Sequence, residues 1–130
     1  MIDNPDTAKT ERIRRLNDLA RAQPVIANAS WVMTEGIAHL LMGHTELDGS
    51  TARKALARMI ALRHAIAEYS DWSEGNDPYG EHDFGVFDLL GQRIFFKVDY
   101  YHPDHDTHAP VPDSTELCRR VLTVMLAEEY

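Results

Sequence analysis

The segment from Asp77 to Asp83 contains the residue types that could carry acid–base or metal chemistry. Glu81, His82 and Asp83 are consecutive there, directly before an apolar run that begins at Phe84. Such a group can transfer protons, and its carboxylates suit hard cations. Alternatively, the same side chains tie a long loop to the adjacent strand by hydrogen bonds. The order of residues does not match the common pattern of metal-dependent nucleases, in which one residue separates a Glu from a Lys on a strand.

A second candidate is the segment 102–108, which has three histidines and two aspartates in seven residues. The histidines, His102, His105 and His108, could bind Zn²⁺ or Ni²⁺. Prolines at positions 103 and 110 favour a loop here, so nothing holds the ligands in place before a metal arrives. We therefore expect no resident metal and no other cofactor, and we keep the three histidines only as candidate ligands.

Nucleophilic catalysis has little support in the sequence. Cys118 is the only cysteine, which excludes a disulfide within the chain and a cysteine-rich zinc site. It lies beside apolar residues, so we expect a small buried thiol. The serines fit helix caps and turns, and no glycine-rich phosphate loop is present. The sequence therefore favours a protein without catalytic activity over an enzyme.

The charge of the chain is segregated along its length. The chain has 130 residues, of which 21 are acidic and 13 are Lys or Arg, so its net charge is −8. Residues 1–65 contain seven acids and nine Lys or Arg, a balance of +2, whereas residues 66–130 contain fourteen acids and four Lys or Arg, a balance of −10. A field of that sign repels phosphate backbones, so nucleic-acid binding is disfavoured outside an N-terminal patch of Arg12, Arg14, Arg15 and Arg21. The same field attracts a basic protein surface.

Length and composition predict one cytoplasmic domain. Single domains commonly have about 100–150 residues, and a hydrophobic fraction of 44% is ordinary for a globular protein. No apolar run approaches the ~18 residues needed to span a bilayer, and the polar N-terminus lacks the apolar core of a signal peptide. We expect a single domain over residues 1–130, in which residues 1–9 form a flexible N-terminal segment leading into the first helix.

Two helices are predicted in the first third of the chain from apolar residues at helical spacing. The first is capped by Asp6 or Thr7 and runs to about Ala22. A short apolar run over residues 31–33 predicts a strand. The second helix is short, and it begins at Thr34 and closes at Gly43.

A long helix is predicted from Ser50 to about Tyr69, followed by a loop over residues 70–80 that is rich in Ser, Gly, Asn, Asp and Pro. The stripe of this helix that we expect to face the core, with Arg63 at its edge, consists of Leu56, Met59, Ile60, Arg63, Ile66 and Ala67.

The clearest local pattern is a β-hairpin, with strands over 84–89 and 93–101 around a short connection that contains Gly91. In the second strand, Ile94, Phe96, Val98 and Tyr100 alternate with Arg93, Phe95, Lys97, Asp99 and Tyr101. The first set should face the core and the second should be half solvated. The register could bring Asp83 close to Asp99 or Tyr101. Phe95 then needs cover from either a helix of this chain or a partner.

A final helix is predicted near the C-terminus. Asp113 and Glu116 are spaced as in a capping box, and Leu117, Val121, Val124 and Met125 follow at i, i+4, i+7 and i+8. Together these elements predict an α+β fold, with helices packed on a small antiparallel sheet that has a central β-hairpin.

Three long blocks of the sequence resemble one family. They cover residues 76–85, 96–101 and 120–130, and with Val32-Met33-Thr34 they resemble the bacterial domain-of-unknown-function family 3768 over about residues 10–130. The resemblance implies a small protein that is frequent on plasmids and other mobile elements and has no established activity. By association, it suggests an accessory or anti-defence role, such as inhibition of CRISPR or restriction machinery.

Our leading hypothesis is a small acidic, non-enzymatic binding protein that occupies a basic surface on a protein partner, with no role at a membrane. The first alternative is a small hydrolase or metal-binding enzyme centred on Glu81, His82 and Asp83, and the second is a homodimer without chemistry of its own. The candidate contact residues of the leading hypothesis are Glu74, Asp77, Tyr79, Glu81, His82, Asp83, Asp88, Phe95, Asp99, Tyr101 and Asp104.

Overall fold

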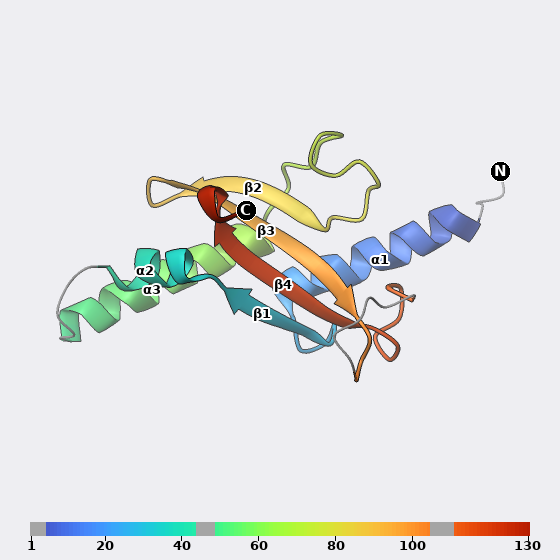
Figure 1. The fold of residues 1–130 in the computed structure, drawn as a ribbon, viewed down its shortest axis with the longest axis horizontal. Helices are drawn as coiled ribbons and strands as arrows, with labels where there is room; N and C mark the ends of the chain where they lie inside the picture. The colour runs from blue at the N-terminus through green and yellow to red at the C-terminus, as the bar shows by residue number, and fades with distance from the viewer. Residues whose placement is uncertain (1–4, 44–48, 105–110) are drawn as a thin grey trace.

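The structure is a computed structural model, and it describes residues 5–43, 49–104 and 111–130. The described residues form three α-helices, a four-stranded sheet and one 3-10 turn (Figure 1). The elements in chain order are α1 (Pro5–Ala22), β1 (Ala29–Met33), α2 (Glu35–Met42), α3 (Gly49–Ala67), β2 (Phe84–Leu89), β3 (Gln92–Tyr101), β4 (Arg119–Leu126) and a 3-10 turn, η1 (Ala127–Glu129). The first helix thus begins inside the segment 1–9, and residues 1–4 lie outside the described part. No described helix is both long enough and apolar enough to cross a membrane.

The sheet has the strand order β1-β4-β3-β2. The α+β class is confirmed, but the sheet is mixed rather than wholly antiparallel, because β1 runs parallel to β4. The hairpin of β2 and β3 is confirmed. It forms one side of the sheet, and the central pair is β3 with β4. The chain reaches β4 only after α2, α3 and the hairpin, so this parallel pair is one that local sequence patterns do not reveal.

The predicted C-terminal helix is wrong, because residues 119–126 form β4. Leu122, Val124 and Leu126 alternate on one face and are buried, and Met125 on the other face is buried as well. A central strand covered on both faces has a nearly continuous apolar run, which fits a helical period as well as a strand period. Leu117, the first residue of the predicted stripe, is exposed.

The hairpin and its alternation are confirmed. Leu90 and Gly91 at the turn have φ values of 54° and 76°, both in the left-handed region that a tight hairpin turn requires. The residues expected in the core, Ile94, Phe96, Val98 and Tyr100, are all buried.

The long helix is confirmed, but its predicted core stripe is only partly right: Ile66 is buried and Met59 packs against the core, as expected. Leu62 and Ile66 face the core, whereas Leu56 and Ile60 have exposed fractions of 61% and 59%. Helix α3 carries alanine or larger apolar residues on several sides, so periodicity alone does not select the buried side.

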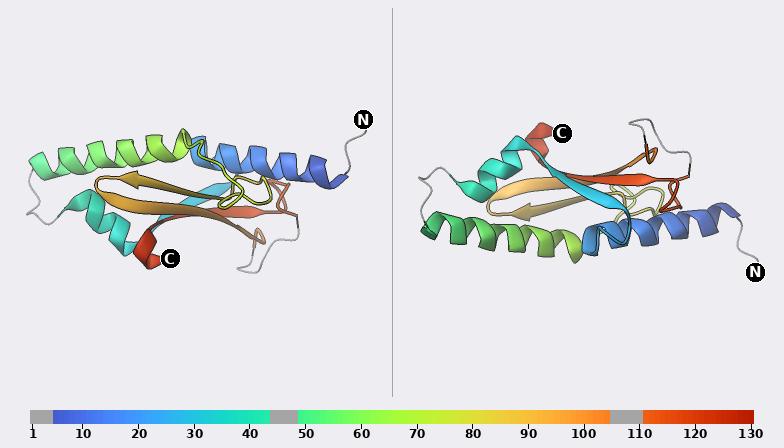
Figure 2. Two further views of the ribbon diagram at one scale, coloured as in Figure 1. Left: turned by 90° about the horizontal axis from the view of Figure 1, so that it is seen from above. Right: turned by 90° about the horizontal axis from the view of Figure 1, so that it is seen from below.

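The helices are not spread evenly around the sheet. Helices α1 and α3 follow one another along one face, while α2 and η1 lie at one end of the sheet (Figure 2). Glu129 of η1 joins this end to α2, because its carboxylate accepts hydrogen bonds from the Thr34 hydroxyl at 2.5 Å and the Gly36 amide at 3.0 Å. On the face away from α1 and α3, Phe95 packs against the rings of Phe84 and Tyr130, with centroid distances of 5.2 and 5.5 Å. Phe95 is therefore covered by two aromatic side chains of this chain and not by a helix.

Gly85 is required by the packing of the hairpin on α3. A Cβ at this position would overlap the ring of Phe96 and approach Tyr69. We expect Gly85→Ala to lower the free energy of unfolding by about 1–3 kcal/mol, the usual cost of overpacking a core. Urea denaturation followed by circular dichroism measures this loss. Gly75→Ala is the control, since the nearest neighbour of a Cβ there is the Ser73 Oγ at 3.8 Å, and equal losses in the two variants would contradict the expectation.

Candidate functional site

His82 is held inside the fold rather than facing a cavity. Its Nδ1 lies 2.8 Å from a carboxylate oxygen of Asp18, and its Nε2 lies 3.6 Å from a carboxylate oxygen of Asp77. The backbone N–H of His82 also donates to Asp77 at 3.0 Å. The imidazole stacks on the Trp72 indole with a centroid distance of 3.9 Å and an interplanar angle of 6°. Both nitrogens and one face of the ring are therefore in contact with the protein.

Arg21 extends this arrangement to two helices. Its guanidinium lies 2.5 Å from the same Asp18 oxygen and donates to the backbone carbonyls of Ile66 and Tyr69, at 3.1 and 3.3 Å. The Ile66 carbonyl is in the last turn of α3, where a cation is favourable, and Tyr69 follows the end of the helix by two residues. The guanidinium also lies over Trp72, 4.9 Å from the ring centroid. The loop 70–83 is thus fastened to α1 and α3 through one chain of contacts.

Glu81 belongs to a second buried network. Its carboxylate accepts a hydrogen bond from the Tyr100 hydroxyl at 3.1 Å. Asn17 donates to that hydroxyl at 2.8 Å and to the Glu81 carbonyl at 3.0 Å, while its own oxygen accepts from Arg120 Nε at 2.9 Å. Burial lowers the pKa of Arg120 and raises the pKa of Tyr100. Asn17 and Arg120 are parts of this site that the sequence did not predict.

Asp83 is joined to the sheet through its backbone. Its backbone carbonyl accepts a hydrogen bond from Val98 N at 2.8 Å, which aligns the start of β2 with β3. Burial, together with the carboxylates of Glu81, Asp77 and Asp99, raises the pKa of Asp83. Glu81, His82 and Asp83 therefore contact three different sets of partners. Within the described part of the chain, no group of three His, Cys, Asp or Glu side chains is arranged to hold a metal ion.

The raised pKa of Asp83 makes a prediction about pH. A carboxyl whose pKa is higher in the folded state than in the unfolded chain destabilises the fold as the pH rises above the unfolded value, here 3.8. Asp83→Asn should therefore raise the melting temperature at pH 7, and the gain should vanish below about pH 3, where the carboxyl is protonated in both states. Melting curves across this pH range provide the test. The exposed Asp104→Asn is the matched control, and a gain that persists at low pH would show that the charge of Asp83 is not its cause.

Within the described residues, neither the histidine-rich segment nor Cys118 forms part of a metal site or of a group of catalytic side chains. His102 Nδ1 accepts a hydrogen bond from the Asp104 amide at 3.1 Å. His105 and His108 lie outside the described residues. Cys118 is buried, and burial raises the pKa of its thiol, which makes it a poor nucleophile.

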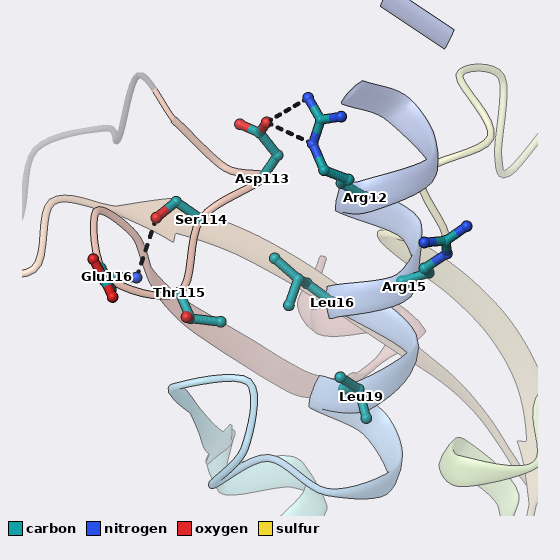
Figure 3. A pocket seen from close by; sticks show the side chains of 8 residues that line it. All are labelled: Arg12, Arg15, Leu16, Leu19, Asp113, Ser114, Thr115 and Glu116. Carbon is teal, nitrogen blue, oxygen red and sulfur yellow. Dashed lines mark hydrogen bonds and ion pairs between the residues drawn. The ribbon is translucent and has the colours of Figure 1, made fainter. Parts of the chain in front are cut away.

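Most arginines of the N-terminal patch contact other parts of the same chain. Arg12 donates to Asp113 through Nε and a terminal nitrogen, at 3.1 and 3.0 Å, and Arg14 donates to the Gly80 carbonyl at 3.3 Å. Arg21 is buried. Figure 3 shows that Arg12 and Arg15 rim a pocket of about 500 Å³ between α1 and residues 113–116. Because Asp113 occupies the Arg12 guanidinium, this pocket offers an anion little beyond Arg15.

The remaining candidate contact residues fall into two groups. Phe95, Asp99 and Tyr101 are half-buried on β3, where Asp99 pairs with Lys97 at 3.2 Å and Arg119 lies 5.2 Å from the Tyr101 ring centroid. The other group is exposed and consists of Glu74, Tyr79, Asp88 and Asp104.

A groove at the outer edge of β2 contains one of these acids, Asp88, together with Asp71, which was not among the candidate contact residues. It has a volume of about 510 Å³ and is bounded by the loop after α3 on one side and by β2 on the other. Asp71 and Asp88 both line it, and both are exposed. The Tyr69 hydroxyl joins the two sides of the groove, because it accepts hydrogen bonds from Val86 N on β2 at 3.2 Å and from Asn76 Nδ2 in the loop at 3.0 Å. We call this surface the edge groove, and it is lined by Tyr69, Ser70, Asp71, Asn76, Val86, Phe87, Asp88 and Arg93.

Fold and surfaces together define a small α+β protein with an acidic groove at one sheet edge and an internally bonded loop above its first helix. The chain belongs to the family described as "Protein of unknown function (DUF3768)", whose model matches residues 33–129. This match confirms the resemblance seen in the blocks 76–85, 96–101 and 120–130. Comparisons with curated proteins and with solved structures gave no match.

Proposed function

We propose that the chain is a non-enzymatic protein-binding module whose edge groove takes a lysine or arginine side chain from a basic segment of a partner. The observation that carries the proposal is the placement of Asp71 and Asp88, two exposed carboxylates that line one groove beside an edge strand. Carboxylates bind guanidinium and ammonium groups through charge-assisted hydrogen bonds. The aromatic rings of Tyr69 and Phe87 supply the apolar walls against which a long basic side chain can lie.

A side chain fits this groove better than an added strand does. Pairing with β2 would require its outward amides, and the amide of Val86 in the middle of the strand already donates to Tyr69. A partner is therefore held by its side chains rather than by a continuous β ladder. The balance of −10 in residues 66–130 supports the same partner chemistry, because it favours encounter with a positively charged surface.

The biological setting that we propose is the one suggested by the family resemblance. The protein would act as an anti-defence inhibitor by occupying the basic surface with which a host protein handles nucleic acid. An inhibitor of this kind needs no catalytic group, and the internal bonding of Glu81 and His82 agrees with that. It lowers DNA cleavage by a restriction or CRISPR nuclease in proportion to its binding to the nuclease.

The binding experiment uses the full chain and a fluorescein-labelled peptide in which arginines alternate with glycine and serine. Asp71→Asn with Asp88→Asn should weaken binding about tenfold or more, because two charge-assisted contacts are lost. Arg93→Gln should strengthen binding, since Arg93 lies 3.2 Å from Asp88 and competes with the incoming cation. Fluorescence anisotropy at two salt concentrations measures both changes. Glu116→Gln removes an exposed acid outside the groove, and equal effects of this control and the double variant would refute the site.

A further inference from the structure

The outward side of α3 has an apolar centre with basic residues beside it. Leu56 and Ile60, with exposed fractions of 61% and 59%, are four residues apart and so lie next to each other on the helix surface. Arg53 and His64 are exposed one turn before and one turn after this pair, and Ala57 is exposed beside it. We call these five residues the α3 outer face.

The chain does not use this face for its own core. Leu62 and Ile66 already bury the opposite side of α3 against the sheet. Single exposed apolar residues are common and need no explanation. Here, however, two large aliphatic side chains are adjacent on a regular helix and are flanked by a small residue that lets another backbone approach closely.

The charges on α3 are of one sign. Between Gly49 and Ala67 the helix has four Lys or Arg and no Asp or Glu. Two of these arginines also make internal contacts, since Arg58 donates to the Leu41 carbonyl at 3.0 Å and the Arg63 guanidinium lies 5.2 Å from the Trp31 ring centroid. Among the ion pairs of the described residues, none involves Arg53 or Lys54. The face therefore presents positive charge beside its apolar centre.

We propose that the α3 outer face docks an amphipathic helix of a protein partner, in which an apolar stripe is flanked by Asp or Glu. Charge complementarity selects this occupant, because acidic side chains beside the apolar stripe of a partner helix meet Arg53 of the α3 outer face and Lys54 next to it. A second copy packed through the same face would bring the basic residues of two α3 helices together. An anionic membrane is a poorer fit, since interfacial helices bury a wide apolar face and α3 has already buried one side in the core.

This interaction is separate from the edge groove and does not rest on it. The edge groove is acidic and lies beside β2, whereas the α3 outer face is basic. Figures 1 and 2 show that β2 is at the edge of the sheet and that α3 is part of the helical layer. A protein with both surfaces can bind one basic and one acidic partner at the same time. In that case the chain would connect two partner proteins, one bound at each surface.

The test uses the full chain and a labelled synthetic helix of about five turns, with leucines at i, i+3, i+4 and i+7 and glutamates on both flanks. A second peptide has lysine in place of each glutamate. Fluorescence anisotropy should show binding of the glutamate peptide and at least tenfold weaker binding of the lysine peptide. Leu56→Ser with Ile60→Ser, and separately Arg53→Glu, should each weaken binding of the glutamate peptide tenfold or more.

Val25→Ser is the matched control, because Val25 is 90% exposed on the turn between α1 and β1. It should leave binding unchanged, as should the edge-groove variant with Asp71→Asn and Asp88→Asn. Equal binding of the two peptides, no binding at concentrations up to about 1 mM, or insensitivity to the Leu56 and Ile60 changes would overturn the proposal. Self-association that the Leu56 and Ile60 changes abolish would assign the face to a second copy instead. Binding to phosphatidylserine vesicles, with no binding of the peptide, would assign it to a membrane.

Discussion

Replacing Arg120 with alanine should lower the free energy of unfolding by about 3–5 kcal/mol, because the change removes the centre of a buried polar network. The Arg120 side chain is buried and donates to Asn17 Oδ1 at 2.9 Å and to the Pro112 carbonyl. Its loss leaves two acceptors without a donor, each of which costs about 1–3 kcal/mol when buried. Urea denaturation followed by circular dichroism measures the total.

Arg119→Ala is the matched control, since Arg119 is the preceding residue and points to the other face of β4. There it lies over the half-buried Tyr101 ring, where such contacts contribute only about 0.5–1 kcal/mol. A double-mutant cycle gives a sharper test. Asn17→Ala and Arg120→Ala remove the same hydrogen bond, so the combined cost should be smaller than the sum by about 1–3 kcal/mol. Strict additivity, or equal losses at positions 119 and 120, would show that the network does not act as a unit.

The elements that the sequence predicted correctly are those whose determinants are local. The hairpin has a two-residue turn with Gly91 and strict alternation in β3, and both features lie within a few residues of the structure that they specify. Helix α2 is similar, because the Thr34 hydroxyl caps it and Gly43 ends it. In these segments the propensity, the cap and the apolar pattern all favour the same structure.

The elements that the sequence did not predict depend on contacts between residues that are far apart in the chain. Strand β4 lies in the middle of the sheet, between β1 and β3, and both α1 and α2 contact it. Of these elements only β3 is its neighbour in chain order. The same holds for the site, since Asn17 and Arg120 are 103 positions apart. One signal was available: in a strand, Arg120 shares a face with Leu122 and Val124, so an arginine on the buried face predicts a polar partner inside.

The candidate contact residues fall into two groups, those exposed to solvent and those that form hydrogen bonds with distant parts of the chain. Exposed acids such as Glu74 and Asp88 lie on the surface, where water solvates a carboxylate, and Arg93, the ion-pair partner of Asp88, is exposed as well. Glu81, His82 and Asp77 do have partners, which the sequence did not reveal. Their hydrogen bonds hold the loop 70–83 in place, so in the proposed binding they position the wall of the edge groove rather than contact a partner.

Arg21 controls that positioning. The exposed fraction of its side chain is only 5%, and it joins Asp18 to the carbonyls of Ile66 and Tyr69. Arg21→Ala should therefore lower the free energy of unfolding by about 2–4 kcal/mol, because it leaves helix-end carbonyls and a carboxylate without their donor. Arg21→Lys should recover only a minor part, since an ammonium group cannot reproduce the planar set of donors.

Arg15→Ala on the same helix is the matched control, because the Arg15 side chain is 75% exposed and lies 4.0 Å from Glu11. An exposed pair of this kind contributes less than about 0.5 kcal/mol. In the proposed binding, Arg21 also links stability to partner affinity, since Tyr69, whose carbonyl it holds, follows α3 and lines the edge groove. Below the unfolding transition, Arg21→Ala should weaken binding of the arginine peptide several-fold and speed hydrogen exchange in residues 70–83, whereas Arg15→Ala should change neither. If Arg21→Ala lowers stability but leaves both local measurements unchanged, Arg21 supports the core alone and the loop keeps its place without it.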